Sequence, residues 1–388
     1  MDMVNEAQKQ VGVHINDEYC SRCFICSSLC PFDAIRKDPE TDKMVLDIEK
    51  CQTCGLCYSS CPAQAIDIIY YDMNSLTRYL ERAKQEYASD TLMIMCKGCA
   101  PETEVVEKIF GISKFVPLSV PCVGRVPENV FLKAISALGM KKIYVLACEE
   151  DYCRFERGSS VATRKILALN LLLEQLGYGK PITLRQNSLK VTVNKDKCIA
   201  CGNCAYHCPY GAATLISGTA DIDEASCHGC GLCVSLCPAF ALELDYWEGD
   251  RISAQVSSLM SGKAKPKFLV FRCQWSVFPS LNGTTDPDVG IIELPCAGRV
   301  DALHVLEALD KGAEGVMIAA CPEEDCKSET GSKEAERSIT ALKKTLSQIG
   351  LDEKLHFYSV SPRYPGAFDD ALKDFKEKLA NPSKETAE

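Results

Sequence analysis

The stretch CQTCGLCYSSCP at residues 51–62 has three cysteines at two-residue gaps, a fourth after a three-residue gap, and then a proline. The same pattern occurs at residues 20–31, 198–209 and 227–238. Three thiolates on one short loop can hold three corners of a cubane [4Fe–4S] cluster, and the fourth then crosses to the other cluster of a pair. Zinc also binds Cys-x2-Cys pairs, but it needs neither the third cysteine nor the trailing Cys-Pro. The four stretches therefore predict two blocks with two [4Fe–4S] clusters each.

The crossing of the fourth cysteine assigns four ligands to each cluster. We call the site built on the first stretch of a block the leading site, and the site built on the second stretch the trailing site. The leading sites are Cys20, Cys23, Cys26 with Cys61, and Cys198, Cys201, Cys204 with Cys237. The trailing sites are Cys51, Cys54, Cys57 with Cys30, and Cys227, Cys230, Cys233 with Cys208. His207 and His228 lie inside these loops, where cysteines already fill every ligand position, so we expect them to tune the clusters or to face solvent.

The composition indicates thiols used as metal ligands rather than as disulfides. The 388 residues include 25 cysteines, and the opening MDMVNEAQKQ shows no secretory signal, so we expect a cytoplasmic protein with reduced thiols. No apolar stretch reaches the roughly 20 residues of a membrane span. A net charge of −10 argues against nucleic-acid binding and suits docking to positively charged redox partners.

The chain is a tandem duplication with a shift of about 175 residues. Each half has a cysteine-dense block, a short helix (expected at 74–90, capped by Asn74 or Ser75, and at 250–262), and a region of alternating strands and helices. The predicted domains are a dicluster ferredoxin domain at 1–73, an α/β domain at 74–187, a second ferredoxin domain at 188–249, a second α/β domain at 250–380, and a disordered tail at 381–388.

The α/β regions alternate apolar strands with helices. In the second half we expect strands in KFLVFRC (267–273), VGIIELPC (289–296), GVMIAAC (315–321) and KLHFYSV (354–360), with helices at 301–313 and about 332–349. In the first half TLMIMC, KFVPLSVPC and KKIYVLAC correspond, followed by a helix at 160–177. This order favours a mostly parallel sheet. The expected fold class is thus α+β and α/β, with two ferredoxin-like domains alternating with two small open parallel-sheet domains.

A second group of cysteines lies at the carboxyl ends of these strands, which is the edge where open α/β sheets hold ligands. Convergence of four thiolates without the ferredoxin spacing suggests a [2Fe–2S] cluster in each α/β domain. A zinc ion held by the same cysteines, or simple burial of free cysteines, are the alternatives. Cys96 and Cys99 after a strand also fit a thioredoxin-type motif. The proposed ligands are Cys96, Cys122, Cys148 and Cys153 in the first domain and Cys273, Cys296, Cys321 and Cys326 in the second.

Several motifs resemble the delta subunit of methyl-viologen-reducing hydrogenase. They are Cys-x-Trp at 273–275, PCAGRV at 295–300 and AACPEEDC at 319–326, with CKGC (96–99), PCVGRV (121–126) and LACEEDYC (146–153) in the first half. Ferredoxin blocks beside such domains also resemble the C-terminal parts of heterodisulfide reductase A-like proteins. These resemblances span residues 14–375. They imply an electron-transfer subunit that couples a hydrogenase or formate dehydrogenase to a flavin-containing heterodisulfide reductase, with electron bifurcation in the assembled complex.

Two features depart from a simple duplication or stay open. The family's opening motif is Cys-x-x-Cys, but the second half has Ser276 where its second cysteine would fall, which leaves Cys99 spare in the first half. Should that thiol be required, the second site is altered or empty. Arg125 and Arg299 follow Pro-Cys-x-Gly, where a guanidinium would offset cluster charge, bind an acidic group of a partner, or simply be solvated.

Motifs for other chemistry are absent from the sequence. There is no Gly-x-Gly-x-x-Gly after a strand, no Cys-x3-Cys-x2-Cys, and no doubled Cys-Cys-Gly, so we expect no catalytic residues and no flavin or nucleotide site of its own. The leading hypothesis is a relay subunit with flavoprotein and dehydrogenase or hydrogenase partners. A free polyferredoxin-type carrier, a reductase acting through an open cluster site, and a subunit of a quinone-interacting oxidoreductase are the alternatives.

Overall fold

The computed structural model describes residues 12–100, 103–262, 265–278 and 286–381. The chain forms two compact units. The first contains the described residues up to Ser188 together with Phe278 and Pro362–Pro365, and the second contains the remaining described residues from Leu189 onward. Each unit therefore combines one cysteine-dense block with one α/β domain.

Each cysteine-dense block folds into two short antiparallel strand pairs and two helices of a single turn. In the first block Val13 pairs with Ile68 and Ile35 pairs with Leu46, and the second block repeats this arrangement. The short strands leave most of the block to cluster-binding loops, as expected for a ferredoxin-like domain. The elements of the first block are β1 (Val13–Ile15), α1 (Ile25–Leu29), β2 (Ile35–Lys37), β3 (Met44–Leu46), α2 (Leu56–Ser59) and β4 (Ile66–Ile68). Those of the second are β9 (Val191–Val193), α7 (Asn203–His207), β10 (Ala213–Ile216), β11 (Thr219–Ile222), α8 (Leu232–Ser235) and β12 (Leu242–Leu244).

Each α/β domain contains a four-stranded sheet in which all neighbouring strands are parallel. The strand orders are β6-β5-β7-β8 and β14-β13-β15-β16, so the chain reverses direction across the sheet beside the first strand, where α/β folds hold ligands. This confirms the predicted fold class. The strands are β5 (Thr91–Cys96), β6 (Val116–Val120), β7 (Lys142–Cys148), β8 (Ile182–Asn187), β13 (Phe268–Cys273), β14 (Val289–Leu294), β15 (Gly315–Ala320) and β16 (Leu355–Ser359).

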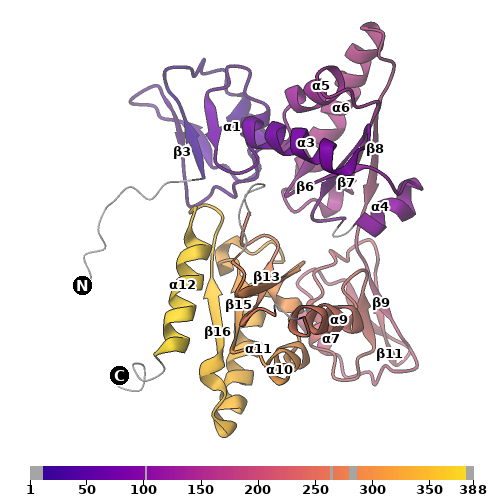
Figure 1. The fold of residues 1–388 in the computed structure, drawn as a ribbon, viewed down its shortest axis with the longest axis vertical. Coiled ribbons are helices and arrows are strands. Elements are labelled where there is room, and N and C mark those ends of the chain that lie inside the picture. Colours follow the sequence, from indigo (N-terminus) through magenta and orange to yellow (C-terminus); the bar gives the residue numbers. More distant parts are fainter. Residues whose placement is uncertain (1–11, 101–102, 263–264, 279–285, 382–388) are drawn as a thin grey trace. The chain divides into compact units, whose positions relative to one another are not determined.

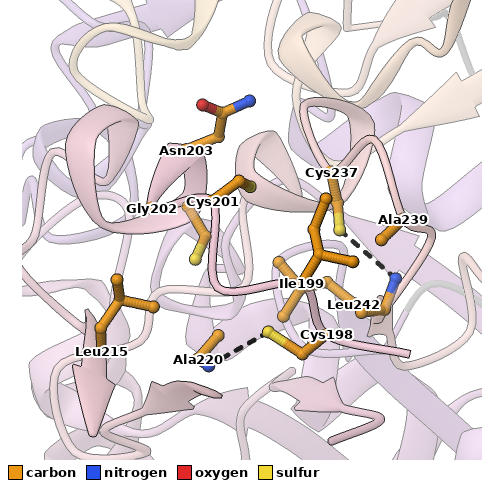
Figure 2. Close-up of a pocket in the computed structure, with 12 residues that line it drawn as sticks. Cys198, Ile199, Cys201, Gly202, Asn203, Leu215, Ala220, Cys237, Ala239 and Leu242 are labelled. Atoms are coloured by element: carbon orange, nitrogen blue, oxygen red, sulfur yellow. Dashed lines mark hydrogen bonds between the residues drawn. The ribbon is translucent and has the colours of Figure 1, made fainter. Parts of the chain in front are cut away.

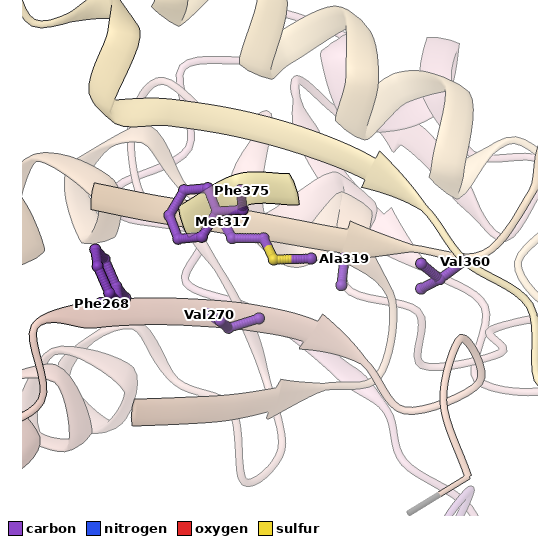
Figure 3. Packing of buried hydrophobic residues seen from close by; sticks show 6 residues of the cluster. All are labelled: Phe268, Val270, Met317, Ala319, Val360 and Phe375. Carbon is purple, nitrogen blue, oxygen red and sulfur yellow. The ribbon is translucent and has the colours of Figure 1, made fainter. Parts of the chain in front are cut away.

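Helices cover the sheets, and Figure 1 labels them. In the second α/β domain one face carries a core in which Phe375 of α12 packs on Phe268, Val270 and Met317 (Figure 3). The rings of Phe268 and Phe375 meet edge to face with centroids 5.5 Å apart, so α12 closes this side of the sheet. The helices are α3 (Met73–Tyr87), α4 (Thr103–Phe110), α5 (Glu128–Ser136), α6 (Gly158–Gln175), α9 (Gly249–Met260), α10 (Ala302–Asp310), α11 (Gly331–Leu346) and α12 (Ala367–Ala380).

The expected connector helices form, with different boundaries. Helix α3 begins at Met73, and Asp72 caps it by accepting hydrogen bonds from the amides of Asn74 and Ser75, so the expectation that Asn74 or Ser75 is the cap was wrong. Helix α9 ends at Met260. Most of the tail expected to be disordered, residues 382–388, lies outside the described residues. In the part of the chain that the structure describes, no helix is both long and apolar enough to cross a lipid bilayer.

Candidate metal centres

The cysteines assigned to each leading site lie around a single pocket. In the second block Cys198, Cys201, Cys204 and Cys237 line it together with Ile199 and Leu215 (Figure 2). In the first block Cys20, Cys23, Cys26 and Cys61 line the equivalent pocket. The fourth cysteine of each set comes from the other stretch of its block, so the fold brings together the crossed pairs that the spacing predicts.

Backbone amides point at the sulfur atoms of these sites. Ala65 donates to Cys61 Sγ and Ala241 donates to Cys237 Sγ, both at 3.3 Å. Ala220 donates to Cys198 Sγ at 3.2 Å, and Figure 2 shows this bond and that of Cys237 as dashed lines. An amide that donates to a sulfur stabilises its ionised form, and the bond from Ala220 is the largest cause of a lowered pKa at Cys198. The loops are therefore shaped to hold thiolates.

The trailing sites are more enclosed. Cys54 is buried, and burial raises the pKa of its thiol to about 12. Burial also raises the pKa of Cys57 well above its ordinary value, and the charge of Cys30 acts in the same direction, which places the crossed ligand beside this loop. In the second block burial raises the pKa of Cys233, with Cys208 among its charged neighbours. Buried thiols ionise only beside compensating positive charge, which the irons of a cluster supply, so this donor set fits a [4Fe–4S] cluster.

The second α/β domain brings its four proposed ligands together at the carboxyl edge of the sheet. Cys273 ends β13, Cys321 directly follows β15, and Cys296 follows β14 by two residues. Hydrogen bonds from the thiols of Cys296 and Cys321 lower the pKa of Cys326, and a bond from Cys321 lowers that of Cys273. The four sulfur atoms thus form one linked group, as the strand-end positions led us to expect.

The first α/β domain repeats this group with one additional thiol. Cys96 and Cys148 end adjacent strands, and their sulfur atoms are 3.4 Å apart. A hydrogen bond from Cys122 lowers the pKa of Cys153. The sulfur of Cys99 lies within 4.8 Å of those of Cys96 and Cys148, and all three residues are buried. Distance alone therefore admits Cys99 as a ligand.

The second repeat shows what the position of Cys99 does without a thiol. Cys99 Sγ donates to the carbonyls of Cys96 and Leu146 at 3.5 and 3.7 Å. In the second repeat Ser276 Oγ donates to the equivalent carbonyls, those of Cys273 and Ala319, at 2.8 and 3.4 Å. Both side chains thus close the turn after the first strand. This shared role supports the choice of Cys96, Cys122, Cys148 and Cys153 as the ligands of the first repeat.

Two glycines that sequence reasoning missed make room for these thiols. A Cβ atom on Gly158 would lie 2.3 Å from Cys122 Sγ, and one on Gly331 would lie 2.3 Å from Cys296 Sγ. Both glycines begin the long helices α6 and α11. The signal was present in the sequence, because a Cys-x4-Gly-Ser stretch follows Cys153 and Cys326 alike. These cradles, which no larger residue could line, show that the thiols are held close to a helix start.

The serine after each glycine anchors the helix start to the site. Ser159 Oγ donates to the carbonyl of Cys148, and Ser332 Oγ donates to that of Cys321. The amide of Ser332 also donates to Cys326 Sγ at 3.3 Å. Amides and the positive end of a helix dipole favour thiolates. Each α/β domain therefore provides four convergent sulfurs in an environment suited to their ionised form.

The arginines of the duplicated Pro-Cys-x-Gly-Arg motif are not solvated. Arg125 and Arg299 are 0% and 1% exposed. Of the two histidines in the cluster loops, His207 lies 3.3 Å from a carboxylate oxygen of Glu334, and the ring of His228 stacks on Tyr210. Burial thus eliminates the surface interpretation of both arginines.

Comparison with known proteins yields three domain matches. A family model described as methyl-viologen-reducing hydrogenase, delta subunit, matches residues 92–192 and 268–381. Models of a 4Fe-4S dicluster domain match residues 19–65 and 191–244. The chain thus contains two dicluster domains, with four [4Fe–4S] sites, alternating with two copies of the delta-subunit domain.

Full-length relatives show the same two resemblances. The A-type polypeptide of the ferredoxin:CoB-CoM heterodisulfide reductase of Methanosarcina mazei is 28% identical over 328 residues, which cover 79% of this chain and 39% of the relative. The D-type iron-sulfur polypeptide of the F420-non-reducing hydrogenase of Archaeoglobus profundus is 31% identical over 99 residues, covering 24% of this chain and 72% of the relative. Its vhu counterpart in Methanopyrus kandleri is 36% identical over 91 residues, covering 23% and 69%. The chain spans about two fifths of the length of the heterodisulfide reductase relatives that it matches.

Proposed function

Because the chain belongs to the family of the methyl-viologen-reducing hydrogenase delta subunit, we propose that it relays electrons within a larger redox complex. It is an iron–sulfur electron-transfer protein related to that family and to the A-type polypeptide of heterodisulfide reductase. The proposed donor is a dehydrogenase or hydrogenase module, and the proposed acceptor is a flavin-containing, heterodisulfide reductase-like module. Electron bifurcation would take place on that partner's flavin.

The contact between the two kinds of site in each unit carries this proposal. In the second unit Cys230 of the trailing site, Leu232 and Cys296 of the α/β site pack in one buried cluster. Ser235 Oγ donates to the carbonyl of Gly298 at 2.5 Å, and in the first unit Ser59 Oγ donates to that of Gly124 at 2.8 Å. A relay needs neighbouring redox sites with little protein between them, and this arrangement provides it twice.

The proposed ligands follow from this arrangement. The two leading and two trailing sets defined above would hold [4Fe–4S] clusters, and the four convergent cysteines of each α/β domain would hold a [2Fe–2S] cluster. When bound, such clusters supply one-electron chemistry at potentials set by charge, hydrogen bonds and solvent exposure. The chain itself holds the thiolates, donates amides to their sulfurs and excludes water from the trailing and α/β sites.

The leading sites provide the exposed ends of the relay. Cys23 and Cys201 are exposed, whereas Cys54 and Cys230 of the trailing sites are buried. Large apolar side chains lie exposed near the leading sites, with Phe24 at 45% exposure in the first block and Ile199 at 65% in the second. Electron-transfer partners dock on such surfaces because a short distance to the cofactor matters more than a large interface. We therefore place the exchange of electrons with other redox centres at the leading sites.

Purification of the full chain without its partners tests the function. The anaerobic protein should bleach with a low-potential reductant and recover its colour with an artificial dye. It should neither oxidise hydrogen, formate or a nicotinamide nor cleave a disulfide, because the chain has no motif for two-electron chemistry. Substrate turnover by the iron-loaded chain alone would contradict a relay role, and turnover that appears only when partner subunits are added would support it.

A further inference from the structure

Two buried arginines lie directly against the trailing cluster loops. A Cβ atom on Gly55 would lie 2.9 Å from Cβ of Arg125, and one on Gly231 would lie 2.7 Å from Cδ of Arg299. Both glycines also have φ near +80°, and each sits between the second and third cysteines of a trailing loop. The trailing loops therefore have glycine at a position that both the backbone turn and the approach of an arginine require.

Backbone carbonyls, rather than carboxylates, hold the Arg125 guanidinium. Its Nη2 donates to the carbonyl of Tyr70 at 2.5 Å and its Nη1 to that of Thr53 at 3.5 Å. The rings of Tyr71 and Phe278 lie 5.1 and 5.7 Å from its central carbon. Among the described residues its buried Nε has no hydrogen-bond partner. The positive charge is thus fixed in place without being neutralised by these contacts.

The charged groups around the two arginines differ. The ionisable groups that act on Arg125 are Tyr71 and the thiols of Cys54, Cys57 and Cys122, all of them proposed ligands except the tyrosine. Arg299 instead has carboxylates beside it, with Asp301 the strongest and Glu243 and Glu248 also acting on it. A third buried arginine of the first unit, Arg363, donates to the carbonyl of Cys51 but is paired with Glu49. Arg125 is therefore the cation whose charge is least shared with carboxylates.

A buried cation has a defined effect on a buried cluster. A cubane with four thiolates has a net charge of about −2, and one-electron reduction makes it more negative. Burial opposes that added charge, and an unscreened positive charge nearby offsets the penalty. We propose that Arg125 raises the reduction potential of the trailing [4Fe–4S] site of the first unit, and that Arg299 does the same more weakly in the second. This inference rests on the proposed function, and it identifies the residue that draws electrons inward from a leading site.

Potentiometric titration of the full-length chain, followed by electron paramagnetic resonance, tests the inference. In Arg125→Met one [4Fe–4S] signal should move to a more negative potential by at least 59 mV, a tenfold change in the reduction equilibrium of a one-electron couple. Arg125→Lys should restore most of the shift, because it keeps the charge. Arg299→Met should shift its own signal less, and Arg185→Met, at an exposed arginine, should shift none. Unchanged potentials in an Arg125→Met protein with full iron content would overturn the proposal.

Wild-type protein provides a second measurement if Arg125→Met loses iron. Cys54→Ser and Cys230→Ser identify the signals of the two trailing sites. The site of the first unit should be reduced before that of the second, and an equal or reversed order would overturn the proposal. Absence of [4Fe–4S] signals from the wild-type chain would instead refute the proposed function, so the two failures are distinguishable.

Discussion

Replacement of Gly331 by alanine should eliminate the metal site of the second α/β domain while leaving the protein folded. The added methyl group would lie 2.3 Å from Cys296 Sγ, whereas ordinary contacts begin at 3.4 Å, so the thiol or the start of α11 must move by about 1.1 Å. Metal sites tolerate displacements of about 0.5 Å. The packing cost of about 1–3 kcal/mol is one that a domain of this size survives.

The assay counts iron and records the cluster signals. If the site holds a two-iron cluster, Gly331→Ala should lose about 2 of about 20 irons per chain and one two-iron signal, with the [4Fe–4S] signals intact. Gly158→Ala should do the same in the first repeat, where the added Cβ would meet Cys122 Sγ at 2.3 Å. Gly249→Ala is the matched control, because Gly249 also begins a helix but has open space around its Cβ position. Full iron and an unchanged two-iron signal in Gly331→Ala would refute the assignment of Cys296 as a ligand.

Three further predictions follow from the same contacts. Cys99→Ser should keep both two-iron signals, because Ser276 already performs the same hydrogen bonding in the second repeat; loss of a signal would make Cys99 a ligand. Lys165→Met should remove the bonds that Lys165 Nζ donates to Ser59 Oγ and the Gly124 carbonyl, at 2.6 and 3.2 Å, and weaken this contact by about 2–4 kcal/mol. Hydrogen exchange at residues 55–60 should accelerate, whereas Ser338→Ala, at the equivalent exposed position of α11, should change nothing. Metal analysis should find about 20 irons per chain, and near-stoichiometric zinc with about 16 irons would replace the [2Fe–2S] clusters by zinc.

The duplication provides an internal comparison that a single domain would lack. Lys165, which pairs with Glu128 at 3.7 Å, corresponds to Ser338, and Glu128 corresponds to Ala302, so the two repeats differ by a whole ion pair. Cys99 and Ser276 differ in the same way at one site. Both arginines, by contrast, are present and buried in both repeats. Features kept in both copies are therefore the better candidates for shared function.

The sequence by itself determined the cluster ligands of the ferredoxin blocks and the parallel sheets. The reason is that both depend on local spacing: a Cys-x2-Cys-x2-Cys loop has one way to surround a cubane, and apolar strands such as 315–321 alternate with helices along the chain. The strand-end cysteines were also predictable, because parallel strands place their carboxyl ends at one edge.

Only the tertiary structure decided which groups lie around those sites. Arg125 is 70 residues from Gly55, and nothing in either local sequence shows that the side chain packs on that glycine rather than in solvent. Gly158 and Cys122 meet because a helix start and a strand end converge, and Cys99 and Ser276 became comparable only when both were seen to close the same turn. Such contacts join residues far apart in the chain, and burial and charge act through space, so the spacing along the sequence does not determine them.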